Sequence, residues 1–164
     1  IIRWQVIEPR WIPSGSMLPT LQIQDKILVE KLTTKINLKN NLFNLKDNIV
    51  VFKPPDALIK AGYDSDIALI KRVIGIPGDK IEVKDGNLYL NDELQNKFIT
   101  DKNINYSIGP IIVPKNSLWV MGDNRNNSMD SHVWGPLPYE KIIGKAILRY
   151  WPLNHFGPIY FPKD

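Results

Sequence analysis

The chain has 164 residues and 43% hydrophobic content, which supports one domain, or one domain with an insertion, and argues against disorder. It contains no cysteine, so disulfide bonds and cysteine-based zinc sites are excluded, and its two histidines leave little room for any other metal cluster. The formal net charge of +4 is compatible with an anionic lipid surface and is weak evidence for nucleic-acid binding. No apolar run reaches the roughly 18 residues that suggest a membrane span.

Short apolar runs separated by Gly and Pro turns predict a mainly β chain. These runs fall at residues 26–30, 48–52, 67–75, 80–84, 88–90, 109–113, 117–121 and 140–151. Residues 1–12 are predicted to form a strand or an amphipathic lead-in, residues 31–47 a loop or weak helix, and residues 56–66 a polar connection. No helical period is sustained, which favours a β-barrel or paired antiparallel sheets.

The aromatic tail, residues 150–162, contains Pro152, Pro158 and Pro162, and these prolines exclude a helix there. Asp85-Gly86 lies between two alternating runs and is a strong hairpin signal. Together these features indicate short strands joined by tight turns.

Residues 13–21 (PSGSMLPTL) are the first candidate functional stretch. Pro13 and Pro19 restrict the backbone on both sides of Ser-Gly-Ser, and Gly15 allows another backbone to come close. The expected result is a rigid extended loop that presents the hydroxyl of Ser16. A serine hydroxyl becomes a nucleophile only when a neighbouring base takes its proton. The alternative is a structural turn without chemistry.

Lys71 is the candidate base, because the alternation of a strand places it on one face with Leu69 and Val73. A free lysine has a pKa of about 10.4, so only about 1 in 2,500 is neutral at pH 7. Burial disfavours the ammonium form and lowers the pKa by up to about 3–5 units. The alternative is an edge-strand lysine whose aliphatic stem carries the charge to water.

Residues 122–131 (GDNRNNSMDS) form a polar loop whose Asn, Asp and Ser side chains can satisfy its own backbone. A self-capped turn without chemistry is the alternative explanation for it. A calcium site is rejected, because the EF-hand pattern needs an acid or Asn at the third position and Gly at the sixth. Counted from Asp123, those positions hold Arg125 and Ser128.

Taken together, three segments resemble the conserved boxes of type I signal peptidases, a family of membrane-bound Ser-Lys endopeptidases. Residues 13–21 resemble the nucleophile box, residues 70–79 (IKRVIGIPGD) the general-base box, and residues 122–131 the third box, in the family's order. The resemblance implies the reaction: removal of N-terminal signal peptides from exported preproteins after a small-x-small (Ala-x-Ala) site. It implies no cofactor, and we expect no nucleic-acid partner.

The resemblance also implies a role for each site residue. Ser16 is the expected nucleophile and Lys71 its general base, while the Ser16 backbone N–H and the Ser14 hydroxyl form the oxyanion hole. Ser128 is expected to orient the lysine. Three further residues are expected to hold the third box together: Asp123, Arg125 and Asp130.

Two residues depart from the family pattern. Many members carry an acid at the position of Asn126 and an arginine at that of His132, and these two usually form an ion pair. An Asn–His pair is the expected replacement, with no catalytic role. This variant looks like the branch from photosynthetic bacteria and plastids.

The family fold implies a catalytic β core of residues 1–79 and 111–164, with a small inserted β region at residues 80–110. The expected class is therefore mainly β, with antiparallel sheets forming a partly open, barrel-like core. Since family members carry N-terminal membrane spans, the chain is expected to be the extracytoplasmic catalytic part of an anchored protein. Trp4, Trp11 and the aromatic tail are expected to touch the lipid bilayer surface, although scattered core aromatics are the alternative.

Two other functions remain open from the sequence. A self-cleaving repressor-type Ser-Lys peptidase shares the β core but needs a DNA-binding or cleavable arm. A catalytically silent β module that binds membrane or peptide would not need both Ser16 and Lys71.

Overall fold

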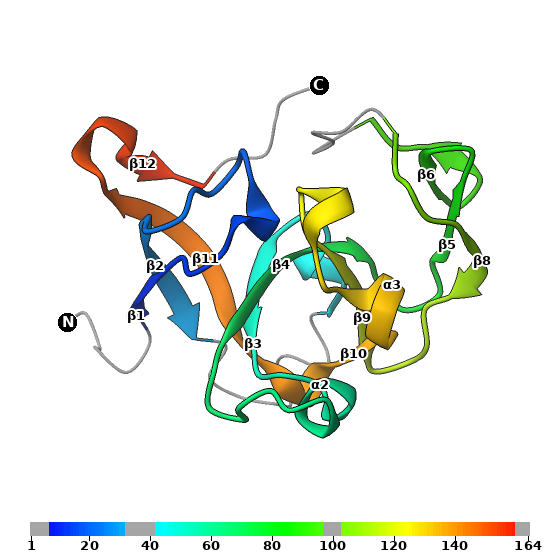
Figure 1. The fold of residues 1–164 in the computed structure, drawn as a ribbon, viewed down its shortest axis with the longest axis horizontal. Coiled ribbons are helices and arrows are strands. Elements are labelled where there is room, and N and C mark those ends of the chain that lie inside the picture. The colour runs from blue at the N-terminus through cyan, green and yellow to red at the C-terminus, as the bar shows by residue number, and fades with distance from the viewer. Residues whose placement is uncertain (1–6, 32–41, 97–102, 160–164) are drawn as a thin grey trace.

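The computed structural model describes residues 7–31, 42–96 and 103–159, which fold into two antiparallel sheets (Figure 1). The larger sheet contains β1 (Ile7–Trp11), β2 (Lys26–Lys31), β3 (Ile49–Phe52), β4 (Leu69–Gly75), β9 (Ser117–Met121), β10 (Leu137–Pro138), β11 (Ile142–Trp151) and β12 (Gly157–Pro158). The smaller sheet contains β5 (Lys80–Lys84), β6 (Asn87–Leu90), β7 (Glu93–Leu94) and β8 (Ile108–Ile112).

Short helical segments connect these strands. They are η1 (Gly15–Met17), η2 (Leu42–Leu45), α2 (Asp56–Lys60), η3 (Arg125–Asn127), α3 (Ser131–Trp134), η4 (Tyr139–Lys141) and η5 (Leu153–His155). Two of them correct the sequence analysis: α2 lies in the expected polar connection, and η5 is a short 3-10 turn in the tail that was expected to lack a helix. Neither contains more than five residues, which is too short for a helical period to show in the sequence.

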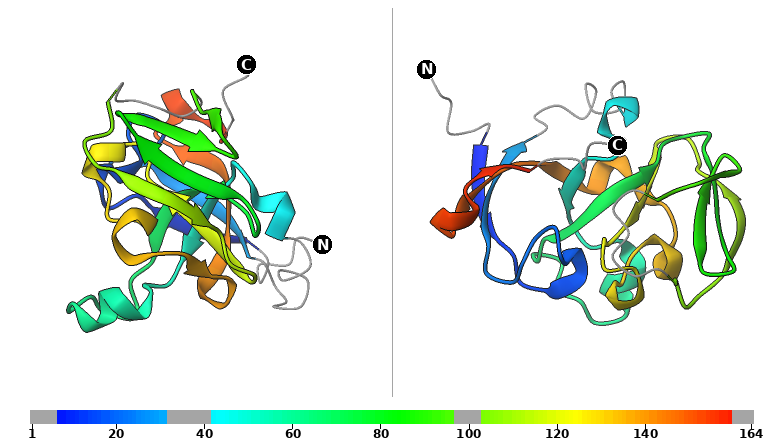
Figure 2. Two further views of the ribbon diagram at one scale, coloured as in Figure 1. Left: turned by 90° about the vertical axis from the view of Figure 1, so that its right-hand side faces the viewer. Right: turned by 90° about the horizontal axis from the view of Figure 1, so that it is seen from above.

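The larger sheet has the order β1-β2-β11-β3-β4-β9-β10, with β12 paired to β11. β11 is ten residues long and changes register at two points against β2 and once against β3. Such bulges bend a strand and increase its twist. The sheet therefore curls into an open, barrel-like layer, seen from above in Figure 2. This confirms the predicted mainly β class.

β4 lies inside the larger sheet, paired to β3 on one edge and to β9 on the other. All its residues except Leu69 are buried. β3 is buried throughout, and Val50, Val51 and Phe52 have no exposed surface. A central strand covered on both faces reads as an almost continuous apolar run, so a lysine and an arginine in β4 are unusual.

The smaller sheet begins with the β5–β6 hairpin, where Asp85 and Gly86 both have positive φ as the Asp-Gly signal predicts. Ile81, Val83 and Leu88 from this sheet pack in one cluster with residues of β4 and β9. The smaller sheet thus shares its core with the larger one, at the side shown in green in Figure 1. β8 continues to Ile112, and the division of the chain into a core and an insertion stays a prediction.

Within the described ranges, no helix is long and apolar enough to cross a bilayer. The predicted lipid contact of Trp4 lies outside the described residues, as does the end of the aromatic tail from residue 160 onward.

Candidate active site

Ser16 lies in η1, on the loop that follows β1. Ile12, Met17 and Leu21 anchor this loop because their side chains are buried in the core between β2 and β3. Ser16 stays partly exposed between these anchors. The loop therefore holds the hydroxyl at the surface while its apolar neighbours fix the backbone, as the two prolines predict.

Lys71 reaches Ser16 from β4. Its Nζ lies 2.8 Å from the Oγ of Ser16, although the two residues are 55 positions apart. Only 4% of Lys71 is exposed, so its amine does not reach water along the strand edge. The structure thus brings the two residues together as the sequence analysis expected.

Burial lowers the pKa of Lys71 to about 8, and the negative charge of Asp130 offsets part of that change. Desolvation disfavours the ammonium form because a buried charge loses its hydration. At a pKa of about 8, about one lysine in ten is neutral at pH 7. A neutral amine at hydrogen-bond distance can accept the proton of the serine hydroxyl.

Ser14 stands beside the candidate nucleophile. Its Oγ donates a hydrogen bond to the Oγ of Ser16 over 3.3 Å, and its hydroxyl makes no bond that would cap η1. A hydroxyl in this position can turn toward an oxygen bound next to Ser16.

Arg72, the residue after Lys71 in β4, forms a buried ion pair with Asp123. Arg72 donates to the two carboxylate oxygens of Asp123 over 2.9 and 2.8 Å, and both side chains are fully buried. Thr20 adds a third hydrogen bond to Asp123 at 2.5 Å. Asp123 therefore joins the nucleophile loop to the strand that carries Lys71.

Asp130 organises the third box from within. Its carboxylate accepts the backbone N–H of Gly122 at 2.9 Å and caps α3 by accepting the N–H of His132 at 3.2 Å. Arg125 donates from Nε to the carbonyl of Gly122 at 2.9 Å. These contacts agree with a holding role for both residues.

Gly122 is crowded on the side that faces the nucleophile. A Cβ at this position would lie 2.5 Å from the carbonyl oxygen of Ser16 and would also collide with the Oγ of Ser128. Only glycine lets these two segments touch. Ser128 is half-buried, and its buried Oγ has no hydrogen-bond partner within the described residues. The bond from Ser128 to Lys71 that the resemblance implies is thus not formed, and the orienting role of Ser128 stays a prediction.

The expected pairing of Asn126 with His132 is wrong. His132 Nδ1 lies 2.5 Å from Asp130, and its ring stacks on Tyr106 with a centroid distance of 3.8 Å. Asn126 instead donates to the carbonyl of Asn103 at 2.9 Å and accepts the N–H of Asn105 at 2.8 Å. The two side chains separate because each finds a better partner: His132 a carboxylate, Asn126 a backbone segment.

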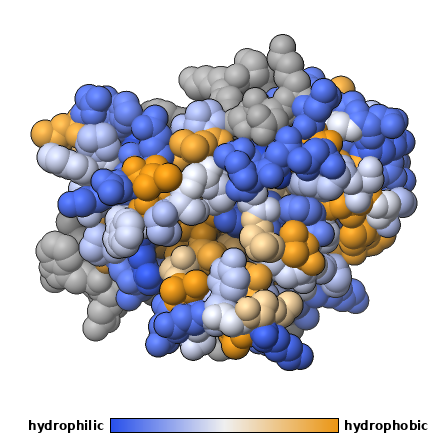
Figure 3. Space-filling view, viewed as in Figure 1, coloured by the Kyte–Doolittle hydropathy of each residue, from blue (hydrophilic) through white to orange (hydrophobic). Residues whose placement is uncertain are grey.

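A cleft with a volume of about 580 Å³ runs past Ser14, Ser16 and Lys71 (Figure 3). Its walls come from the nucleophile loop, α2 and the segment after it, β4, and the third box; they include Leu58, Tyr63, Ile67, Asn124 and Met129. A much smaller cavity of about 30 Å³ opens beside the dyad, between Ile12, Met17, Leu69 and Ile70. The arrangement offers an extended chain a path across the serine.

Sequence reasoning missed Asn124. Its side-chain Nδ2 donates to the carbonyl of Gly15 at 3.1 Å, and its backbone N–H donates to the carbonyl of Ser16 at 3.0 Å. Its place directly after Gly-Asp in the third box was visible, but the sequence carries no signal for its partners.

No group of three or more His, Asp or Glu side chains that could hold a metal ion occurs in the part of the chain that the structure describes.

The fold is a curled antiparallel β sheet, and its cleft holds a serine and a buried lysine at hydrogen-bond distance. Comparisons with known proteins identify the family. The model of the signal peptidase family, peptidase S26, matches residues 1–151. A probable signal peptidase I-2 of Synechocystis is 43% identical over 156 residues, which cover 95% of this chain and 68% of that protein.

Two further relatives narrow the branch. A signal peptidase I of Leptolyngbya laminosa is 42% identical over 163 residues, 99% of this chain and 78% of the relative. A probable chloroplastic thylakoidal processing peptidase 2 of Arabidopsis thaliana is 41% identical over 97% of this chain and 42% of its own length. The chain therefore belongs to the type I signal peptidases of peptidase family S26, in their cyanobacterial and plastid branch.

Proposed function

We propose that this chain removes N-terminal signal peptides from exported preproteins, with Ser16 as the nucleophile and Lys71 as its general base. The observation that carries the proposal is the 2.8 Å separation between Ser16 Oγ and Lys71 Nζ at the floor of the cleft. Membership in a signal peptidase family supports the substrate class.

The reaction follows from this geometry. Neutral Lys71 accepts the hydroxyl proton as Ser16 Oγ attacks the scissile carbonyl carbon. The Ser16 N–H and the Ser14 hydroxyl stabilise the oxyanion that forms. The C–N bond then breaks, and the Lys71 ammonium gives its proton to the leaving amine. Water attacks the acyl-enzyme with Lys71 again as base, which releases the signal peptide and regenerates Ser16.

The cavity beside the dyad supports a small residue before the cut. Its volume of about 30 Å³ is small, which favours a small side chain such as that of alanine. A second hollow of about 250 Å³ lies near Arg10, Asp66 and Ala68. Because side chains of an extended peptide alternate, residues one and three before the cut face the same side. We propose strict selection of alanine in the small cavity and looser selection in the larger hollow.

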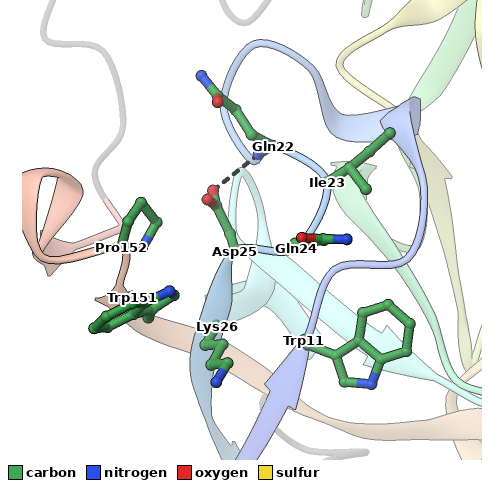
Figure 4. Close-up of a pocket in the computed structure, with 8 residues that line it drawn as sticks. All are labelled: Trp11, Gln22, Ile23, Gln24, Asp25, Lys26, Trp151 and Pro152. Atoms are coloured by element: carbon green, nitrogen blue, oxygen red, sulfur yellow. Dashed lines mark hydrogen bonds between the residues drawn. The ribbon is translucent and has the colours of Figure 1, made fainter.

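A surface with two exposed tryptophans supports contact with a membrane. Trp11 and Trp151 lie on either side of an open pocket with Lys26 between them (Figure 4). Leu153 and Phe156 are exposed nearby on the turn after β11. Tryptophan is enriched at membrane–water interfaces, where its ring is apolar and its N–H remains hydrated.

We propose that this surface rests on the extracytoplasmic face of the membrane, periplasmic or thylakoid-lumenal, from which the substrate emerges. Replacing Trp11 and Trp151 by serine is expected to weaken co-sedimentation with lipid vesicles. Unchanged co-sedimentation of the double variant would remove this surface from the proposal.

The distribution of strands supports a core with an insertion. We propose that residues 80–110 are inserted into the catalytic β core formed by residues 1–79 and 111–164. A chain in which a short linker replaces residues 80–110 should then keep the Ser16–Lys71 pair but lose stability, since Trp119 and Met121 would become exposed. Loss of the curled sheet in that chain would show that the two parts fold as one.

The test of the proposed function is cleavage of a preprotein with an Ala-x-Ala site, followed by sequencing of the new N-terminus. The native chain should cut after the second alanine, and folded Ser16→Ala should not. Covalent labelling of Ser16 by a serine-reactive inhibitor provides a second readout. A native chain that neither cuts nor labels would be a silent module, and cutting by Ser16→Ala would exclude Ser16 as nucleophile.

A further inference from the structure

We propose that Asn124 is a positioning residue that sets the oxyanion hole and the direction of the nucleophile at the same time. The inference rests on the proposed function. Its structural basis is the pair of hydrogen bonds from Asn124 to the two carbonyls on either side of the Ser16 backbone.

The first bond orients the peptide unit between Gly15 and Ser16. A trans peptide is planar, and its C=O and N–H point in opposite directions. Asn124 Nδ2 holds the carbonyl of Gly15 at 3.1 Å, and the N–H of Leu18 donates to the same oxygen at 3.1 Å. Fixing the carbonyl therefore fixes the N–H of Ser16 on the other side of that plane, where the oxyanion forms.

The second bond orients the next peptide unit. The backbone N–H of Asn124 holds the carbonyl of Ser16 at 3.0 Å. With the peptide units before and after Ser16 both fixed, its Cα–Cβ direction is fixed as well. This direction sends Oγ toward Lys71 Nζ, which lies 2.8 Å from it.

Asn124 is itself tied to the strand that carries the base. It follows Asp123, whose carboxylate is held by Arg72 in β4, and Arg72 is the neighbour of Lys71. Contacts thus run from β4 through Asp123 and Asn124 to Ser16. They fix the nucleophile loop, which carries Ser16 Oγ and the Ser16 N–H, relative to the strand that carries Lys71.

The side-chain bond is tested by Asn124→Leu, which removes the amide but keeps the backbone N–H. Asn124→Ser is a second variant whose side chain is too short to reach Gly15, in case leucine prevents folding. Asn126→Leu is the matched control, because it is an Asn→Leu change in the same turn whose side chain contacts residues 103–105 instead. Each chain is assayed with an Ala-x-Ala peptide.

The kinetic readout separates positioning from binding. Asn124→Leu should lower kcat about 10²-fold, as loss of one oxyanion donor does. Its Kd for a peptide with the scissile carbonyl reduced to CH₂, which cannot form an oxyanion, should change less than about twofold. Asn126→Leu should keep its kcat. An equal loss in kcat and in affinity for the reduced peptide would instead make Asn124 a substrate contact, and an unchanged kcat would overturn the proposal.

An NMR readout does not depend on the reaction. The Ser16 amide resonance should be sharp in the native chain and in Asn126→Leu, but shifted or broadened in both Asn124 variants. If the native chain fails to cleave, the proposed function fails while this measurement still decides the positioning role. An unchanged Ser16 resonance in both Asn124 variants would show that the side chain does not hold this peptide unit.

Discussion

Arg72 donates two hydrogen bonds to the carboxylate of Asp123, at 2.9 and 2.8 Å, while the adjacent Lys71 points to the hydroxyl of Ser16. Two neighbouring cations in one buried strand thus have opposite surroundings. Within the described residues, no carboxylate lies within ion-pair distance of Lys71. A buried cation with a carboxylate keeps its charge, whereas a buried amine without one releases its proton more easily. Arg72 is therefore suited to holding Asp123 in place, whereas Lys71 is suited to accepting a proton from Ser16.

Replacing Lys71 by methionine should abolish cleavage and stabilise the fold at pH 7. The folded pKa of about 8 lies below the unfolded value of 10.5. The native state therefore binds the Lys71 proton less tightly than the unfolded state does. The resulting loss in the free energy of unfolding is fully present below pH 8 and disappears as the pH rises toward 10.5. It amounts to about 3 kcal/mol at about 1.4 kcal/mol per pKa unit. Urea unfolding at pH 7 and pH 10 measures it.

From pH 7 to pH 10, the free energy of unfolding of the native chain should rise relative to that of Lys71→Met. A variant that is less stable than the native chain at pH 7 would mean that Lys71 contributes more through packing than its buried charge costs. Circular dichroism of both chains controls for a change of fold.

Replacing Ser14 by alanine should lower kcat about 10²–10³-fold, because one of two oxyanion donors is lost. The variant should remain folded, since Ser14 is exposed and, among the described residues, its side chain hydrogen-bonds to Ser16 alone. Steady-state kinetics and thermal unfolding check both parts. Near-normal turnover would exclude the Ser14 hydroxyl from the oxyanion hole.

Replacing Asp123 by asparagine should cost about 3–5 kcal/mol of stability, the usual effect of removing one partner from a buried ion pair. Arg72 would keep its charge in a fully buried position. The double variant Arg72→Met/Asp123→Leu should recover much of the loss because it leaves no charge unpaired. Urea unfolding of the native chain, Arg72→Met, Asp123→Leu and the double variant forms a double-mutant cycle. Additive effects in that cycle would argue against direct coupling.

Replacing Gly122 by alanine should disturb the site more than the fold. The added Cβ would meet the carbonyl of Ser16 at 2.5 Å, which forces the third box and the nucleophile loop apart. Overpacking of this kind costs roughly 1–3 kcal/mol. We expect kcat to fall at least tenfold in a chain that still unfolds cooperatively. A fully active Gly122→Ala would show that the close approach is not required.

The sequence predicted most strands because apolar runs between Gly and Pro turns are a local signal. It also predicted which residue types gather in the site. It did not predict α2, which has five residues, or the partners of His132 and Asn124. Those depend on how the curled sheet brings η1, β4 and the third box together. The 2.8 Å distance between Ser16 Oγ and Lys71 Nζ, which are 55 positions apart, cannot be calculated from local sequence patterns.

The pH dependence of kcat/KM for an Ala-x-Ala peptide, measured from about pH 5.5 to 10.5, tests the Ser16–Lys71 pair most directly. Activity should rise as Lys71 loses its proton, with a midpoint at about pH 8, since its pKa is lowered to about 8 by burial. Folded Lys71→Met should be inactive at every pH. A midpoint near the ordinary lysine value, or measurable activity in Lys71→Met, would contradict the assignment of Lys71 as the general base.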